Sequence, residues 1–135
     1  MDFSTLIQPG MTHEMSFEVQ EEHLASHIGS GAARVLATPW LIMFMERTSH
    51  QLIARHLPPG YSSVGTAIDM RHLAPTPLGG KVRVVAEIVA VDNAQVSLQV
   101  QAWDEIELVG TCNHQRFIID EARFLKRVAA KANSG

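Results

Sequence analysis

The segment that decides the fold is "LATPWLIMFMERTSHQLIARHL", residues 36–57. Its Thr38-Pro39 pair is typical of a helix start, because a threonine side chain caps free N–H groups and proline suits the first helical position. We therefore expect a helix with Thr38 as its N-cap that runs to about Leu57 and stops at the Pro-Pro-Gly of residues 58–60. At about 1.5 Å per residue the helix spans roughly 30 Å, and its apolar run predicts that it is buried.

The chain on both sides of this helix has the alternating pattern of half-buried strands. One such segment, residues 13–20, precedes the helix, and a helical turn with a Gly/Ser-rich loop over residues 21–35 leads from it to the helix. Four strand-like segments follow, at residues 62–77, 79–92, 94–104 and 107–119, and residues 120–132 resemble a short terminal helix. One strand, one long helix and four strands in a meander is an α+β pattern. A hotdog fold, a curled antiparallel sheet wrapped around a long central helix, fits this order, although the order does not separate it from other α+β folds.

The composition fits one domain that spans residues 1–135. The 46% of hydrophobic and 19% of charged residues are ordinary for a globular protein, and we expect disorder only in the tail, at about residues 131–135. The net charge of −3, with scattered basic residues, predicts no nucleic-acid partner and no membrane partner. The single cysteine, Cys112, rules out an internal disulfide and suits a reducing compartment, so we expect a cytoplasmic location.

Glu46 stands out because it closes an almost unbroken apolar run. The residues three and four positions before it, Met43 and Ile42, are both apolar. A carboxylate in such surroundings is costly unless it is paired, which predicts a paired or functional Glu46. The alternative is that the buried face ends at Met45 and that Glu46 opens the polar face of the helix.

His72 and Thr38 are two further candidates. Strand alternation puts four residues on one face: Thr66, Ile68, Met70 and His72. That face should pack on the long helix, so His72 points inward. An inward histidine can be a catalytic residue or a structural residue held by hydrogen bonds, and the pattern leaves both open. Capping alone explains Thr38, but a helix N-terminus also offers N–H donors that stabilise a developing oxyanion.

Motifs for a metal or a cofactor are incomplete. "HEMSF", residues 13–17, begins like the HExxH of zinc proteases but lacks the second histidine, and His23 and His27 have helical spacing without further ligands. The sequence has neither a phosphate-binding GxxxxGK loop nor a GxSxG serine elbow. We therefore expect no metal and no cofactor.

Three segments together resemble the fluoroacetyl-CoA thioesterase family, a branch of the hotdog-fold acyl-CoA thioesterases. They are "ATPWLIMFMER" (37–47), "VGTAIDMRHLAPTPLGG" (64–80) and "GTCNHQRFII" (110–119). Family members share an Ala-Thr before the central helix, with a Met-Glu eight residues after the threonine. They also share a Gly-Thr-Ala-Ile followed by a histidine and a Thr-Pro pair, and then a late Gly-x-x-x-His-x-Arg strand. The three segments keep the family's order and approximate spacing over residues 36–119.

The resemblance implies an acyl-CoA thioesterase with Thr38, Glu46 and His72 as catalytic residues. It also implies substrate-binding or supporting roles for Gly65 and Arg116. Coenzyme A is then part of the substrate and no separate cofactor is needed. Hotdog proteins generally pair with their sites at the subunit interface, so the resemblance further implies a homodimer or a higher oligomer.

The chain departs from the family at Pro39, where relatives have a glycine, and in the stretch before Thr38. The specialised fluoroacetate enzyme has aromatic lid residues in that stretch, whereas this chain has "GSGAARV" at residues 29–35. Glycine and alanine predict a more open pocket. The expected reaction is therefore hydrolysis of a small or medium acyl-CoA, without specificity for the fluoroacetyl group.

The spacing of Thr38 and Glu46 predicts a composite site. Eight helical residues put them about 12 Å apart along the axis and roughly 80° apart around it, too far for both to contact one reacting carbon. We expect at least one catalytic residue to come from a partner subunit. The residues leave two alternatives open: a hotdog hydratase or dehydratase of acyl thioesters, which also pairs histidine with a carboxylate, and a non-catalytic acyl-CoA binding domain.

Overall fold

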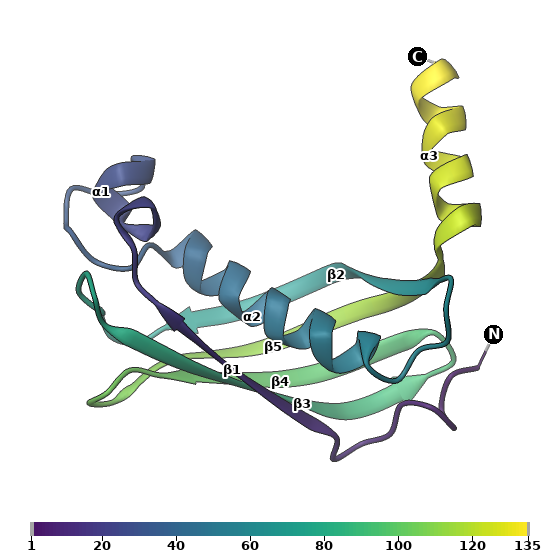
Figure 1. Cartoon of the computed structure of the whole chain (residues 1–135), viewed down its shortest axis with the longest axis horizontal. Helices are drawn as coiled ribbons and strands as arrows, with labels where there is room; N and C mark the ends of the chain where they lie inside the picture. Colours follow the sequence, from purple (N-terminus) through teal and green to yellow (C-terminus); the bar gives the residue numbers. More distant parts are fainter. Residues whose placement is uncertain (1, 135) are drawn as a thin grey trace.

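The computed structural model describes residues 2–134 and has the predicted α+β hotdog architecture (Figure 1). A curled sheet lies along one long helix, and short helical turns cap one end of that helix. The elements in chain order are β1 (Thr12–Glu18), η1 (Glu21–His23), α1 (Ala25–Ile28), α2 (Thr38–Ala54), β2 (Tyr61–His72), β3 (Lys81–Asp92), β4 (Gln95–Trp103), β5 (Leu108–Asp120) and α3 (Glu121–Ser134).

The five strands form one antiparallel sheet in the order β1-β3-β4-β5-β2. Strands β3, β4 and β5 form a meander, but the predicted four-strand meander is wrong for β2. Strand β2 pairs with β5, from Tyr61 opposite Asp120 to His72 opposite Gly110, and forms an edge of the sheet. Alternation shows which face a residue occupies but not which strand lies beside it, so the pattern could not reveal this crossover.

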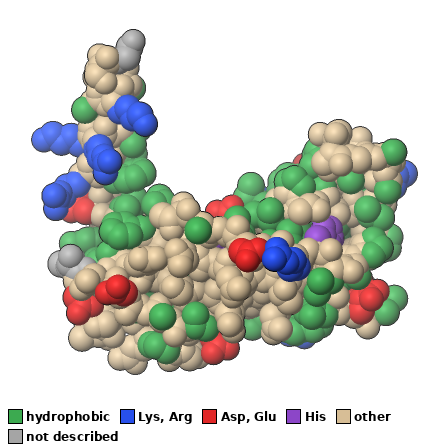
Figure 2. Space-filling model, turned by 180° about the vertical axis from the view of Figure 1, so that it is seen from behind, with side chains coloured by type: hydrophobic (Ala, Val, Ile, Leu, Met, Phe, Trp, Pro, Cys, Tyr) green, Lys and Arg blue, Asp and Glu red, His purple; other side chains and the backbone are tan. Residues whose placement is uncertain are grey.

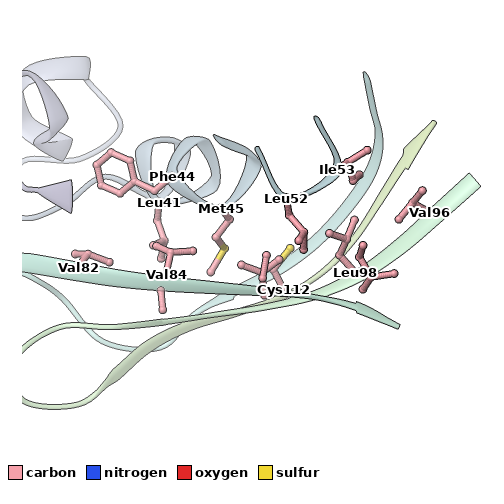
Figure 3. Close-up of a cluster of buried hydrophobic side chains, with 14 of the residues drawn as sticks. Leu41, Phe44, Met45, Leu52, Ile53, Val82, Val84, Val96, Leu98 and Cys112 are labelled. Atoms are coloured by element: carbon pink, nitrogen blue, oxygen red, sulfur yellow. The ribbon is translucent and has the colours of Figure 1, made fainter. Parts of the chain in front are cut away.

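Apolar side chains fill the space between α2 and the sheet (Figure 3). The fully buried apolar residues of α2 are Leu41, Phe44, Met45, Leu52 and Ile53. Phe44 also stacks on Phe17 of β1, with ring centroids 4.3 Å apart. Each such side chain contributes roughly 1.5–3 kcal/mol by leaving water, so the position of α2 on the sheet is strongly fixed.

The start of α2 differs from the prediction. Ala37 is the N-cap, and Thr38 and Pro39 are the first helical residues, without a side-chain hydrogen bond to the helix end. The hydroxyl of Thr38 is used elsewhere, as described below. The helix ends at Ala54 and not near Leu57, because the chain turns before the two prolines that follow.

Helix α3 extends away from the rest of the molecule (Figure 1). It runs from Glu121 to Ser134 and has no buried residue. It therefore includes most of the segment 131–135 for which the sequence predicts disorder, while Gly135 lies outside the described residues. Among residues 2–134, no helix is long and apolar enough to cross a membrane.

Candidate active site

Thr38 and His72 form one end of the candidate site. The Thr38 hydroxyl, at the start of α2, lies 2.8 Å from Nδ1 of His72, at the end of β2. Thr38 is exposed and His72 is half-buried. The two residues come from distant parts of the sequence, so the sheet and the helix must both be in place before this pair exists.

The inward face predicted for β2 is only partly correct. Met70 packs against the core, and His72 is half-buried as expected. Ile68, however, is 36% exposed. A β-bulge between Gly65 and Ala67 shifts the register at Thr66, and such a bulge interrupts the alternation from which the face was inferred.

Burial lowers the pKa of His72, and the backbone of Ala74 opposes this shift. The imidazole is therefore neutral near pH 7. A neutral imidazole has one donor and one acceptor nitrogen, so when Nδ1 donates to the Thr38 hydroxyl, Nε2 can accept a proton. This Nε2 is buried and has no hydrogen-bond partner among residues 2–134. His72 thus presents a free nitrogen that suits proton transfer.

Glu46 lies at the other end of the site and has a charged partner. Its Oε2 is 3.6 Å from a terminal nitrogen of Arg116. The side chain of Arg116 is 6% exposed and that of Glu46 is 40% exposed. Both sequence interpretations of Glu46 therefore hold in part: the carboxylate is paired, and it also sits at the border of the buried helix face.

Buried hydrogen bonds hold Arg116 in place. Its Nε donates to the Ser63 hydroxyl at 2.9 Å, and one terminal nitrogen donates to the Ser63 carbonyl at 2.9 Å. The other terminal nitrogen donates to Nε2 of His114 at 3.2 Å. His114 in turn donates from Nδ1 to the carbonyl of Ala67 at 2.8 Å, and burial lowers its pKa, which keeps the ring neutral. Arg116 is thus an anchored cation behind Glu46.

Gly65 makes room for the Glu46 carboxylate. A Cβ at this position would lie 2.9 Å from Oε2 of Glu46 and 3.3 Å from the His114 ring. The first distance is shorter than real Cβ contacts allow, so a larger residue would push the carboxylate away. Gly65 thus leaves space for the carboxylate, and its role in substrate binding stays a prediction.

The two ends of the site are far apart in one chain. Glu46 lies against Gly65, and His72 is further along the same strand. At about 3.3 Å per residue, and with the bulge taken into account, this separation is roughly 20 Å. Glu46 and the Thr38–His72 pair of one chain therefore cannot contact the same carbonyl group.

Each end opens onto its own cavity. The Thr38–His72 cavity measures about 330 Å³, and its walls include the apolar residues Val35, Leu73 and Pro75. The Glu46 cavity measures about 310 Å³ and includes Gly65 and His114. The two cavities share no lining residue, and both volumes are at the small end of the range for ligand sites, roughly 300–1,000 Å³.

Sequence reasoning assigned no role to Ser63 or His114. His114 belongs to the Gly-x-x-x-His-x-Arg motif, and alternation along β5 places it on the same buried face as Arg116. That periodicity could have revealed its position, although not its hydrogen bonds. Within the described part of the chain, no cluster of three or more His, Cys, Asp or Glu side chains is arranged to hold a metal ion.

Comparison with known protein families gives one match for most of the chain. The family model of the fluoroacetyl-CoA-specific thioesterases matches residues 19–122. A fluoroacetyl-CoA thioesterase from Streptantibioticus cattleyicolor is 36% identical over 101 residues, which cover 75% of this chain and 73% of that protein.

Solved structures agree with this match. A structure of the fluoroacetyl-CoA thioesterase has a TM-score of 0.86 at 30% identity and covers 93% of this chain and 97% of its own. A thioesterase superfamily member from Thermus thermophilus has a TM-score of 0.85 at 25% identity, over 96% of this chain and 98% of its own. A hot-dog-like protein from Thermanaerovibrio acidaminovorans, at 24% identity, supports the fold alone: its TM-score is 0.89, over 97% of both chains.

Proposed function

The chain belongs to the fluoroacetyl-CoA-specific thioesterase family and is an acyl-CoA thioesterase. From that premise we propose that it hydrolyses small or medium acyl-CoA molecules. We also propose that its active sites are composite and lie between the two subunits of a homodimer. One observation carries the proposal. The two parts of the site, Glu46 and the Thr38–His72 pair, are each well ordered by their own contacts but lie roughly 20 Å apart along β2. A second subunit is the simplest source of the missing part.

Edge strand β2 offers a way to bring the two parts together. Its twelve residues contain no proline, and its outer edge pairs with no other strand among residues 2–134, so a second β2 can pair with it. Antiparallel pairing about a two-fold axis between Ile68 and Asp69 sets Gly65 opposite His72 of the partner subunit. Directly opposed residues have Cα atoms about 4.5–5.5 Å apart. This register brings Glu46 of one chain to the partner's Thr38–His72 pair, and symmetry makes two such sites.

The roles of the residues follow from their positions. Glu46 acts as the base that takes a proton from water, or as the nucleophile, at the thioester carbonyl. The unprotonated Nε2 of His72 takes up the proton that the water gives up and then delivers it to the departing thiolate, and Thr38 orients the ring or the carbonyl. Water adds its oxygen to the acyl carbon, the C–S bond breaks, and a proton passes to coenzyme A. Free N–H groups at the start of α2 can polarise the carbonyl.

The substrate class follows from the cavities. Both are small, and the segment before Thr38 contributes the small residues Ala25 and Ser30 to the wall of the Thr38–His72 cavity. Such a wall fits a short or medium acyl group and lacks aromatic side chains that would select fluoroacetyl. The single cysteine, buried and unpaired, is compatible with a reducing compartment, so we place the enzyme in the cytoplasm.

The test is thiol release from a panel of short, branched and aryl acyl-CoAs. The wild type should release thiol from at least one of them. Acyl-CoA binding without thiol release would favour a binding domain, and a change in enoyl absorbance without thiol would favour a hydratase or dehydratase.

Mixed dimers test the composite site directly. Glu46→Gln and His72→Ala should each be inactive as homodimers. A mixed dimer of the two keeps one intact site, so an equal mixture in which subunits exchange should recover about a quarter of wild-type activity. Recovery of no activity in verified mixed dimers would contradict the composite site while leaving the thioesterase activity untouched.

A further inference from the structure

Helix α3 has an exposed apolar face. At 100° per residue, the larger apolar side chains fall on one side of the helix: Phe124, Leu125 and Val128. Arg123, Lys126 and Arg127 fall on the other side, and Lys131 lies at the border of the apolar face, next to Phe124. Leu125 is 62% exposed and Val128 is 48% exposed. An apolar stripe on a surface helix normally packs against another apolar surface, so the exposed part of this face should pack on a surface outside the single chain.

We propose that this apolar face packs on the second copy of the chain and walls the partner's Thr38–His72 cavity. The inference rests on the β2 pairing proposed above. Helix α3 begins directly after Asp120, which pairs with Tyr61 at the start of β2. In that pairing, Tyr61 extends past His72 of the partner subunit and lies beside the segment that follows the partner's β2. The base of α3 is then two strand spacings, about 10 Å, from the segment that follows the partner's β2. A separation of about 10 Å is typical of packed helices, so the two can be in contact.

The partner presents a matching apolar surface at this point. The residues that follow β2 include Leu73 and Leu78, which are 55% and 45% exposed, and Ile28 on the nearby α1 is 39% exposed. The loop before Thr38 is held over this segment by a bridge between Val35 and Pro77. Of these residues, Val35 and Leu73 line the Thr38–His72 cavity, and the others lie on segments that continue from its wall. An apolar helix face placed there would cover them and the cavity mouth.

The shape and charge of α3 favour a second copy over other occupants. Figure 2 shows the molecule hollowed between α3 and the end that carries α1, with hydrophobic side chains on the side of α3 toward this hollow and basic side chains around the rest of the helix. A flat bilayer would not reach into the hollow, whereas a second protein surface can. Two α3 helices would not pair with each other, because each carries four basic residues and one acidic residue.

Cross-linking tests this placement without relying on activity. In the double variant Leu125→Cys/Leu73→Cys, the two thiols of one chain lie near opposite ends of β2, too far apart for a short bismaleimide. We expect a covalent dimer, because the proposed pairing sets the new thiol on α3 near position 73 of the partner subunit. The native Cys112 is buried, and its burial raises the pKa of the thiol to about 12, so it should not react. Leu125→Cys/Ser16→Cys, with the second thiol on the far edge strand β1, is the matched control and should stay monomeric on a denaturing gel.

Charge insertion tests the consequence for the reaction. Val128→Lys puts a charge into the apolar face, and Ala130→Lys puts the same charge on the opposite side of α3. We expect Val128→Lys to raise the dissociation constant of the dimer, measured by sedimentation, and to raise KM for acyl-CoA. Ala130→Lys should be close to the wild type in both quantities.

The outcomes separate the two proposals. If the wild type is an active dimer but the Leu125→Cys/Leu73→Cys variant gives no cross-link, the docking of α3 is wrong. The proposed function is then unaffected. Co-sedimentation of the wild type with phosphatidylglycerol vesicles, without the cross-link, would assign the face to lipid and also overturn the docking. A wild type without thiol release contradicts the proposed function, and the cross-link still decides the docking.

Discussion

The two ends of the site hold their side chains in opposite ways. At the His72 end, a single hydrogen bond to an exposed threonine orients a neutral ring, and one ring nitrogen is left free. At the Glu46 end, a half-exposed carboxylate faces a buried arginine that three hydrogen bonds immobilise. The first arrangement suits a group that gains and loses a proton. The second suits a carboxylate that must be held in a fixed position beside the reacting carbonyl, so the two ends differ in how firmly they hold the group that reacts.

The largest effect should come from removing either chemical group. Glu46→Gln keeps the shape of the side chain and removes its charge, and His72→Ala removes the proton carrier. We expect each change to lower kcat/KM for the best acyl-CoA by ~10²–10⁴-fold, the range for general acid–base groups. Thiol release measures this. If His72→Ala stayed within a few-fold of the wild type, the ring would be structural and the contrast between the two ends would disappear.

The next effect should come from the crowded end. Gly65→Ala adds a Cβ that would lie 2.9 Å from Oε2 of Glu46, so the carboxylate must move. A displacement of about 1 Å at a catalytic group can cost on the order of 10²-fold in rate. Gly31→Ala is the matched control, because its new Cβ would meet only the Ala25 side chain at 3.8 Å. Equal activity of both variants would show that the Glu46 carboxylate tolerates displacement.

The sequence predicts the parts of the site better than their arrangement. The apolar run of α2 predicted a buried helix because burial follows from local pattern. Glu46 and His72 were conspicuous because each interrupts such a pattern. The resemblance to a family supplied their roles, and it also singled out Gly65 and Arg116.

Other features depend on contacts between distant segments, and local pattern does not encode these. Thr38 looks like a helix cap from its neighbours, yet its hydroxyl bonds to His72 once β2 lies beside the helix start. The pairing of β2 with β5 and the bulge at Thr66 follow from the whole sheet. The anchoring of Arg116 by Ser63 required both strands to be placed.

A smaller effect should come from loosening Arg116. Ser63→Ala removes the hydroxyl that accepts from Nε of Arg116 and leaves a buried charged donor without that partner. Such a loss costs about 1–3 kcal/mol of unfolding free energy, measurable by urea titration. Because Arg116 positions Glu46 and does not reach the acyl-CoA in our proposal, kcat should fall with little change in KM. The neighbouring Ser62→Ala is the control. A rise in KM with unchanged kcat would instead place Arg116 in substrate binding.

The smallest effect should be a shift in pH dependence at the His72 end. Burial lowers the pKa of His72 below its ordinary value of 6.5, so the ring stays neutral to a lower pH than a free imidazole does. If neutral His72 is the active form, the acidic limb of kcat/KM should have its midpoint below pH 6.5, and His72→Gln should remove that limb from its residual activity. His27→Gln, on the exposed α1, should leave the profile unchanged.

The same shift affects stability in a defined direction. A histidine with a lowered folded-state pKa binds fewer protons in the folded chain than in the unfolded chain, so its contribution to stability is complete above pH 6.5 and is lost as the pH falls below that value. The pKa of His114 is also lowered by burial, so Tm should fall as the solution is acidified from pH 7 to pH 5. His72→Gln should reduce this fall, because one buried neutral ring is removed. A Tm that does not change over this range would mean that neither ring is held neutral, and the proton-transfer role of His72 would lose its physical basis.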